Sequence, residues 1–395
     1  MKIYEIGTGY TPIPAQMGAA TEIVVEELTR ALRNNGHDAV IVDIKTEKRK
    51  KIDLPIIEVS VPKKYTGTDV SLGIAHKLKR VVYSINLALT LKKLLKNNTE
   101  RVVLHFHNQY NMFFFLKLVS EKIRKNCFIA YTNHSYIWHG EWSEIKTIIR
   151  KRYFQEVYCM KHADCVYVLN EKTVETLIKY VGIPDEKIVL IDNGVNTKVY
   201  QPLDEKEKKA LREVQGKEAQ TIFIQIGSVC ERKNQLGSIR LLLPFLKENR
   251  SITYLYAGGI IDEEYQNAIE EYVKKNEIDE QVRYLGELKP GDELNKYYNL
   301  ADAMIFPSKS EGFSLVIVEA MSAGVPVIIN KKLQFKLSKA CLRFSDKEDF
   351  RKIVEMKIFN KNEQRNLSEK SRHIVVEQYS WDKIARDYFE TWEKL

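Results

Sequence analysis

Two carboxylates stand alone in a stretch whose other residues would normally be buried. In SEGFSLVIVEAMSAGVPV (310–327), Glu311 and Glu319 are the only charged side chains among apolar and small residues. A carboxylate can accept hydrogen bonds from two adjacent hydroxyls, so the pair suits the diols of a ribose or a hexose. The alternatives are that Glu311 interacts with a helix dipole and that Glu319 is a buried, hydrogen-bonded polar residue.

Backbone amides and two cations predict an anion site near these acids. A strand (AMIFPS), a tight loop and a helix (LVIVEAMSAG) follow one another, and the first helical amides lack partners, which suits a phosphate. These amides belong to Phe313, Ser314 and Leu315. Arg232 and Lys233 follow another strand and Gly227 in IGSVCERKNQ (226–235). There they could neutralise a departing diphosphate, although such a pair is more often a solvated surface.

The glycines after the first strand disfavour the binding of a dinucleotide such as NAD. Gly7 and Gly9 do not complete GxGxxG. Asp43 also lies much further along than the roughly 20 residues that separate this fingerprint from its ribose-binding acid. Gly18 and Ala19 instead begin the next predicted helix, and these small residues leave the backbone accessible to a ligand.

Three histidines are candidates for the other half of a site. His105 and His107 alternate on the strand LHFH and so share one face of it, while His134 ends the strand CFIAYTNH. We expect His105 to be structural, and His107 to meet His134, which could hydrogen-bond a sugar hydroxyl. No Asp or Cys lies nearby to complete a set of metal ligands, and the chain has no DxD sequence. No metal is therefore expected.

These residues are expected at the strand ends of two α/β domains. Short apolar segments alternate with helix-period segments, which predicts parallel sheets covered by helices on both faces. The charged segment 204–220 interrupts the alternation, so we expect domains at 1–197 and 198–380. A C-terminal helix at 381–395 has an apolar face and packs either on its own domain or back on the first. That face consists of Trp381, Ile384, Tyr388 and Trp392.

The element boundaries follow from the same patterns. The predicted helices include 20–34, 75–97 and 142–160. The predicted strands of the first half are 2–7, 39–44, 56–61, 101–107, 127–134 and 165–170. Those of the second half are 221–227, 253–259, 282–288, 303–308 and 325–330. Two doubly wound sheets are the simplest arrangement of these segments.

The composition is that of a globular protein whose first half is basic. Hydrophobic residues make up 44% and charged residues 29%, which excludes a disordered chain. No uncharged apolar run reaches the length of about 18 residues that a membrane span needs. The start, MKIYEIGTGY, predicts a strand and not a signal peptide, and five cysteines without CxxC favour a reduced, cytoplasmic compartment.

The excess positive charge suggests an anionic partner. The net charge of +9 arises within residues 1–200, because Lys and Arg balance Asp and Glu in the rest. The predicted helices at 75–97 and 142–155 are rich in Lys and Arg among apolar residues, so they could lie on an anionic membrane at its inner face. Their basic residues are Lys77, Lys79, Arg80, Lys92, Lys93, Lys96, Lys146, Arg150, Lys151 and Arg152. The alternative is ordinary packing helices with a solvated basic face.

The sequence resembles the retaining glycosyltransferases of family 4, which have the GT-B fold. The resemblance runs over nearly the whole chain through motifs that include LHFHN, YTNH, VLIDNGVNTKVYQP, IGSVCERKN and YSWDKIA. Its most specific part is the E-x7-E signature in 301–328. The resemblance implies two Rossmann-like domains that face a deep cleft, with no metal or other cofactor.

The implied reaction is the transfer of a hexose-type sugar from a nucleotide-diphosphate sugar, with retention of configuration. A UDP-sugar is favoured, with a GDP-sugar as the alternative, and the acceptor is a glycan, a lipid-linked or a small molecule. Glu319 would bind the ribose, and Glu311 and His134 the donor sugar at the reaction centre. The other implied contacts are Arg232, Lys233, Gly227 and residues 313–315 for the diphosphate, Leu285 and Glu287 for the base, and Gly18, Ala19 and His107 for the acceptor and diphosphate side.

Three departures from the family pattern accompany the resemblance. Ser228 follows Gly227 where the family often has Arg, so Arg232 must supply that cation. Ala19 stands where the family often has a second glycine. The segment 330–350 stands where the family usually has a glycine-rich segment that ends in Glu. The competing functions are a GT-B-fold nucleotide-sugar epimerase and a non-catalytic nucleotide-sugar-binding subunit. A nucleic-acid partner is not expected, because no nucleic-acid-binding motif accompanies the basic charge.

Overall fold

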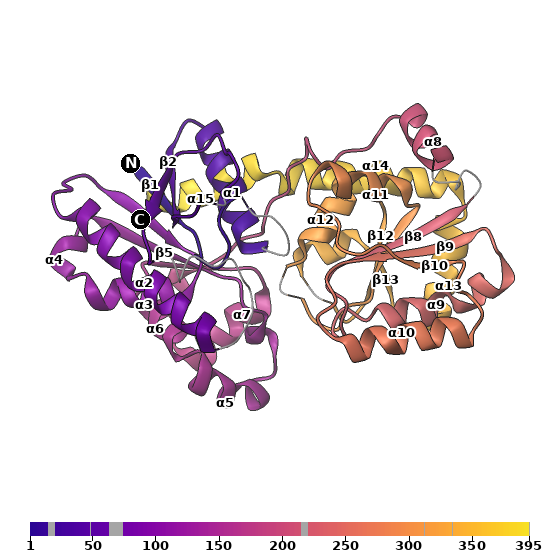
Figure 1. Ribbon diagram of the computed structural model, residues 1–395, viewed down its shortest axis with the longest axis horizontal. Coiled ribbons are helices and arrows are strands. Elements are labelled where there is room, and N and C mark those ends of the chain that lie inside the picture. The colour runs from indigo at the N-terminus through magenta and orange to yellow at the C-terminus, as the bar shows by residue number, and fades with distance from the viewer. Residues whose placement is uncertain are drawn as a thin grey trace. The chain divides into compact units, whose positions relative to one another are not determined.

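The chain folds into two compact units (Figure 1). The computed structural model describes residues 1–14, 20–47, 49–62, 74–214, 220–311, 313–333 and 335–394. One unit is Met1–Gly194 with Trp381–Leu395, and the other is Val195–Ser380. In each, the described strands form a parallel sheet with helices on both faces, which confirms the predicted class of two Rossmann-like α/β domains.

The sheet of the first unit has the strand order β3-β2-β1-β4-β5-β6-β7. Its strands are β1 Lys2–Ile6, β2 Asp38–Ile44, β3 Ile56–Val59, β4 Val102–Phe106, β5 Cys127–Asn133, β6 Cys165–Val168 and β7 Ile188–Leu190. β4 and β6 are buried along their whole length, as expected of strands covered on both faces. The strand order reverses between β1 and β4, and ligands of such sheets bind beyond the carboxyl ends of strands at this point.

Helices of the first unit lie on both faces of this sheet. They are α1 Ala20–Asn34, α2 Ile74–Leu95, α3 Gln109–Leu118, α4 Glu121–Arg124, α5 Trp142–Arg152, α6 Phe154–His162, α7 Glu171–Thr176 and α15 Trp381–Lys394. Tyr83 of α2, Phe115 of α3 and Ile149 of α5 share one apolar core with the strands. Val25 of α1 packs with Ile41 of β2 in a separate core cluster. The apolar residues of these four helices therefore lie on the face that each helix buries.

The second unit is built in the same way, with strand order β10-β9-β8-β11-β12-β13. Its strands are β8 Thr221–Ile226, β9 Ile252–Ala257, β10 Val282–Tyr284, β11 Ala303–Phe306, β12 Val327–Asn330 and β13 Leu342–Phe344. Its helices are α8 Glu205–Val214, α9 Gln235–Glu248, α10 Glu263–Lys275, α11 Asp292–Leu300, α12 Leu315–Ser322, α13 Lys347–Ile353 and α14 Lys361–Tyr379. Helices α9, α10 and α13 cover one face and α11, α12 and α14 the other (Figure 1).

The C-terminal helix α15 belongs to the first unit, where it packs against α1. Its buried face contains Trp381, Ile384, Tyr388 and Trp392. Asn35, at the end of α1, donates a hydrogen bond to the carbonyl of Asp382 at 3.1 Å, and the rings of His37 and Phe389 stack at 3.5 Å. The helix thus completes the core of the unit that begins the chain.

The structure differs from the elements expected from the sequence in three respects. The single helix expected at 142–160 is two helices, α5 and α6, separated by Tyr153, whose backbone (φ −120°, ψ 17°) is not helical. The charged segment 204–220 contains α8, where Arg212 binds Asp302 at 3.0 Å. The short strands β7 and β13 were not predicted, and β13 lies within the atypical segment 330–350.

Candidate functional site

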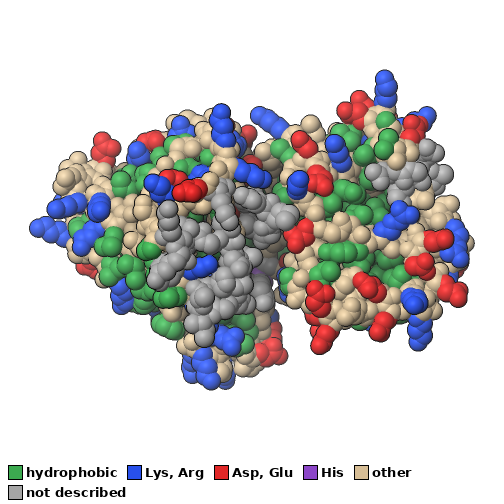
Figure 2. All heavy atoms as spheres, viewed as in Figure 1, with side chains coloured by type: hydrophobic (Ala, Val, Ile, Leu, Met, Phe, Trp, Pro, Cys, Tyr) green, Lys and Arg blue, Asp and Glu red, His purple; other side chains and the backbone are tan. Residues whose placement is uncertain are grey.

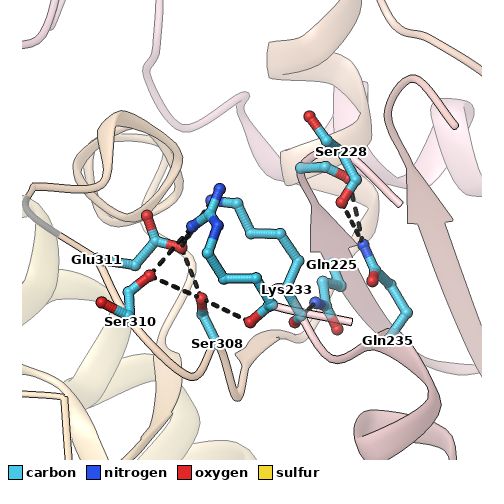
Figure 3. Close-up of polar contacts among 9 residues, drawn as sticks. Gln225, Ser228, Lys233, Gln235, Ser308, Ser310 and Glu311 are labelled. Carbon is cyan, nitrogen blue, oxygen red and sulfur yellow. Dashed lines mark hydrogen bonds and ion pairs between the residues drawn. The ribbon is translucent and has the colours of Figure 1, made fainter. Parts of the chain in front are cut away.

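The loop after β11 brings Glu311 against two cations from the loop after β8 (Figure 3). Arg232 Nη1 donates to Glu311 Oε1 at 2.8 Å, and Lys233 Nζ lies 2.8 Å from the same oxygen. Because β8 and β11 are parallel neighbours, their following loops leave the sheet at the same edge. The structure therefore brings together three residues that were singled out in the sequence.

Hydrogen bonds within these two loops fix the carboxylate. Ser308 Oγ donates to Glu311 Oε1 at 2.6 Å, and Arg232 also donates to the carbonyl of Ser310 at 3.0 Å. Burial lowers the pKa of Lys233, and the charge of Glu311 opposes that shift. The Glu311 and Lys233 side chains are only 8% and 12% exposed, against 34% for Arg232. Arg232 is therefore the cation that an anion arriving from solvent meets first.

Two glutamine side chains hold the cation-bearing loop. Gln225 Nε2 donates to the carbonyl of Lys233 at 2.8 Å, and Gln235 Nε2 donates to that of Ser228 at 3.0 Å (Figure 3). Gly227 has φ 145°, a backbone conformation that residues with a side chain rarely adopt. The tight turn and the two glutamine hydrogen bonds fix the direction in which Arg232 and Lys233 leave the sheet.

The N-terminus of α12 follows Glu311 directly. Leu315 is its first residue and the buried Ser314 its N-cap, and the ring of Phe313 lies 6.4 Å from that of Tyr379. The first amides of a helix have no acceptor within it and form its positive end. The predicted amide donors thus lie next in the chain to the ion-paired carboxylate, while Gly312 lies outside the described residues.

Glu319 lies inside α12 and has a different partner from Glu311. Its carboxylate is buried and accepts a hydrogen bond at 3.0 Å from the hydroxyl of Tyr298, on α11. Burial raises the pKa of Glu319 to about 7, although hydrogen bonds from Tyr298 and Tyr200 lower it in part. The alternative role of Glu319, a satisfied buried polar residue, is therefore compatible with this geometry.

The two residues expected near a nucleotide base follow the end of β10. Leu285 is half-buried and donates its amide to the carbonyl of Tyr256, on β9, at 2.9 Å. Glu287 is exposed and approaches the backbone of Gly259, where a Cβ would lie 2.6 Å from its carboxylate. Both residues thus lie just beyond the carboxyl end of β10.

The histidines of the first unit form a cluster with an acid that was not predicted. His107 Nδ1 lies 3.0 Å from His134 Nε2, so these two residues meet as expected. Glu5 of β1 contacts both His105 Nδ1 (3.1 Å to Oε1) and His107 Nε2 (2.9 Å to Oε2). A Glu within the apolar strand KIYEI is the sequence signal that could have identified it.

The same cluster offers a set of atoms that could hold a metal ion. The ligand atoms of Glu5, His105 and His107 all lie within 4.8 Å of one another. Glu5 was not expected at this site, because only Asp and Cys were considered as further ligands beside the histidines. The three residues are fully or almost fully buried, and each facing nitrogen is within hydrogen-bond distance of the carboxylate. A network held by protons alone thus accounts for these distances, and the absence of a metal remains a prediction.

The remaining candidates of the first unit are placed differently. Gly18 and Ala19 lie outside the described residues. Asp43 is fully buried and is bound by its own chain, since it accepts from the amide of Ile13 and from Arg49, both at 2.9 Å. The Oδ2 atom of this acid is therefore engaged within the fold, which does not favour a dinucleotide site.

Comparisons with known proteins agree with this architecture. The family described as Glycosyltransferase Family 4 matches residues 21–199, and the family described as Glycosyl transferases group 1 matches residues 207–336. A relative, the alpha-galactosylglucosyldiacylglycerol synthase of Streptococcus pneumoniae, is 28% identical over 259 residues. That alignment covers 63% of this chain and spans 65% of the relative's length.

Solved structures share the fold along the whole chain. Sucrose-phosphate synthase from Thermosynechococcus elongatus has a TM-score of 0.76 at 20% identity, over 100% of this chain and 98% of that one. Anabaena HepE, solved in complex with UDP and glucose, has a TM-score of 0.74 at 15% identity, over 100% of both chains. At such identities the likeness establishes the fold alone.

Proposed function

The chain belongs to the GT-B glycosyltransferases of family 4 type, and on that premise we propose that it moves a hexose from a nucleotide-diphosphate sugar to an acceptor with retention. The observation that carries the proposal is the grouping of Glu311, Arg232 and Lys233 directly before the N-terminus of α12. Cations and helix amides suit a diphosphate, and the carboxylate suits sugar hydroxyls. The grouping thus matches the two chemically different ends of a sugar diphosphate.

In the proposed reaction, the bond between C1 of the sugar and the diphosphate oxygen breaks. Arg232, Lys233 and the amides at 313–315 stabilise the charge that develops on the departing diphosphate. The acceptor oxygen bonds to C1 on the same face, and its proton passes to the diphosphate, so that configuration is retained. Because protein groups supply the positive charge, the reaction does not need a metal ion.

UDP is the nucleotide that we favour in the donor, with GDP as the alternative. The resemblance in sequence favours UDP, and HepE, a protein of the same fold, was solved with UDP and glucose. For the acceptor we favour a glycolipid or a growing glycan over a small molecule, because the named product of the Streptococcus relative is a glycosylated diacylglycerol. Both choices are proposals for this chain.

We further propose that the first unit rests on an anionic membrane surface. Helix α2 exposes Leu89 and Leu94 beside Lys92 and Lys93, a mixture of apolar and basic groups that suits the interfacial region of a bilayer. Figure 2 shows further Lys and Arg side chains around α4 and α5, whereas acidic side chains gather over α10 of the second unit. Among the helices that the structure describes, none has the length and apolar character to cross a bilayer.

A panel of nucleotide sugars tests the donor site. We expect one member to raise the melting temperature, since a ligand that binds only the folded protein stabilises it, and to be turned over with the acceptor. Replacing both cations (Arg232→Ala with Lys233→Ala) should abolish the shift. Lys309→Ala is the matched control, because this cation of the neighbouring loop is 54% exposed and pairs with Glu231. A full shift in the double variant would refute the diphosphate site.

A further inference from the structure

A chain of polar contacts crosses the interior of the first unit at the carboxyl ends of three neighbouring strands. Glu5 on β1 pairs in register with His105 on β4, and His107 and His134 follow the ends of β4 and β5. From Glu5 the contacts run to His107 at 2.9 Å and on to His134 at 3.0 Å. On the other side they run through His105 to Thr132 Oγ1 at 2.7 Å. Glu5 and His107 are almost completely buried.

The contacts fix which nitrogen carries each proton. The Glu5 carboxylate lies within hydrogen-bond distance of His105 Nδ1 and His107 Nε2, and an ionised carboxylate can only accept. His107 must therefore donate from Nε2. The imidazole form that predominates at pH 7 is neutral and has a single N–H, so with this proton on Nε2 the Nδ1 of His107 is an acceptor.

The direction of the next contact follows. The acceptor Nδ1 of His107 faces Nε2 of His134 at 3.0 Å, so His134 must carry its proton on Nε2. The neutral form of His134, which is the ordinary form of an imidazole at pH 7, has no second N–H. Its Nδ1 then carries a lone pair and no proton, and can accept a hydrogen bond but not donate one.

We propose that Glu5 and His107 are positioning residues that hold His134 in the Nε2–H form, so that its Nδ1 accepts a hydrogen bond from a hydroxyl of the sugar substrate. The proposal rests on the proposed function for the identity of that substrate. A nitrogen that can only accept binds a group that donates a hydrogen bond, such as a hydroxyl. It disfavours a bare anionic oxygen, with which two lone pairs would face each other.

A bound metal would impose the opposite arrangement. In that case the lone pairs of His105 Nδ1 and His107 Nε2 would face the ion, together with Glu5. His107 would then carry its proton on Nδ1 and donate to His134, whose Nε2 would be bare. The tautomers of His107 and His134 therefore distinguish the two arrangements, and metal analysis of the purified protein gives an independent reading.

Long-range proton–nitrogen NMR of the protein with nitrogen-15 histidines tests the proposal without any substrate. His107 and His134 should both show the Nε2–H form at pH 7, with signals assigned from His107→Gln and His134→Gln. In Glu5→Gln the fixed tautomers should be lost. In that variant kcat should fall about 10²-fold while the Kd for the nucleotide stays unchanged.

Glu156→Gln is the matched control, since Glu156 is another buried carboxylate of this unit and accepts from Tyr131 at 2.7 Å and Trp138 at 2.8 Å. It should leave the tautomers and kcat as they are. An Nδ1–H signal for His107 in the unaltered protein, or an unchanged kcat in a folded Glu5→Gln variant, would overturn the proposal. If the unaltered protein turned over no nucleotide sugar, the proposed function would fail, whereas the tautomers would still be read directly.

Discussion

Glu319 is a buried carboxyl that changes protonation near neutral pH, because burial raises its pKa to about 7. Accepting both hydroxyls of a ribose requires the ionised form. Affinity for a nucleotide sugar should therefore rise as pH increases, by about tenfold per pH unit below 7, and level off above it. Calorimetry of nucleotide-sugar binding between pH 5 and 8 measures this, since a diphosphate esterified at both ends does not titrate there.

The stability of the fold should change with pH in the opposite direction. The folded pKa of Glu319 is raised above its ordinary value of 4.5, so its contribution to stability is complete below pH 4.5 and is lost as pH rises through about 7. Glu319→Gln removes the titrating group and should make nucleotide affinity independent of pH in this range. A wild-type affinity that stayed constant from pH 5 to 8 would exclude Glu319 from the ribose site.

Individual site residues were predictable where the sequence has a local pattern. Glu311, Arg232 and Lys233 could be identified because each follows a recognisable strand, and parallel neighbours bring their loops to one edge. Ser308 and Glu5 were missed although each contacts a candidate residue. Contacts of this kind depend on which strands are neighbours, and a single sequence does not reveal that order.

At the scale of elements, α15 should stabilise the unit to which it returns. Trp392 is completely buried, and its ring lies 5.7 Å from that of His105. Trp392→Ala should lower the free energy of unfolding by about 3–5 kcal/mol, measured by urea denaturation. Glu393→Ala changes an exposed neighbour on the same helix and should cost less than about 0.5 kcal/mol. Equal stability of the two variants would show that α15 does not complete this core.

Most elements could be predicted from apolar periodicity, and the exceptions have physical reasons. The periodicity continues from α5 into α6, so it gave no sign of the break at Tyr153. Strands β7 and β13 have three residues each and, unlike the equally short β10, were not recognised within a longer strand-like segment. The atypical segment 330–350 still supplies β13, an edge strand of the second sheet. The strand order of the second sheet thus includes this segment although its sequence departs from the family pattern.

At the scale of the whole molecule, the uneven charge predicts attraction to anionic lipid. The chain should sediment with phosphatidylglycerol-containing vesicles at low salt and be released as salt rises. Lys92→Glu with Lys93→Glu on α2 should weaken binding at least about 30-fold, because each Lys near such a surface contributes about 1 kcal/mol. Lys274→Glu with Lys275→Glu makes the same change at the exposed end of α10 and should have little effect. Equal losses in both double variants would argue against a specific membrane face.

The proposed function of the molecule requires that the carboxylate of Glu311 acts in sugar transfer. The most direct test measures release of the nucleoside diphosphate from the nucleotide sugar in the presence of acceptor, for the unaltered chain and for Glu311→Gln. Glu348→Gln, an exposed residue that pairs with Lys352, is the control. We predict that Glu311→Gln lowers turnover by about 10²-fold or more while the fold and the control remain unaffected. Turnover by a folded Glu311→Gln variant at the unaltered rate would show that this carboxylate does not act in sugar transfer.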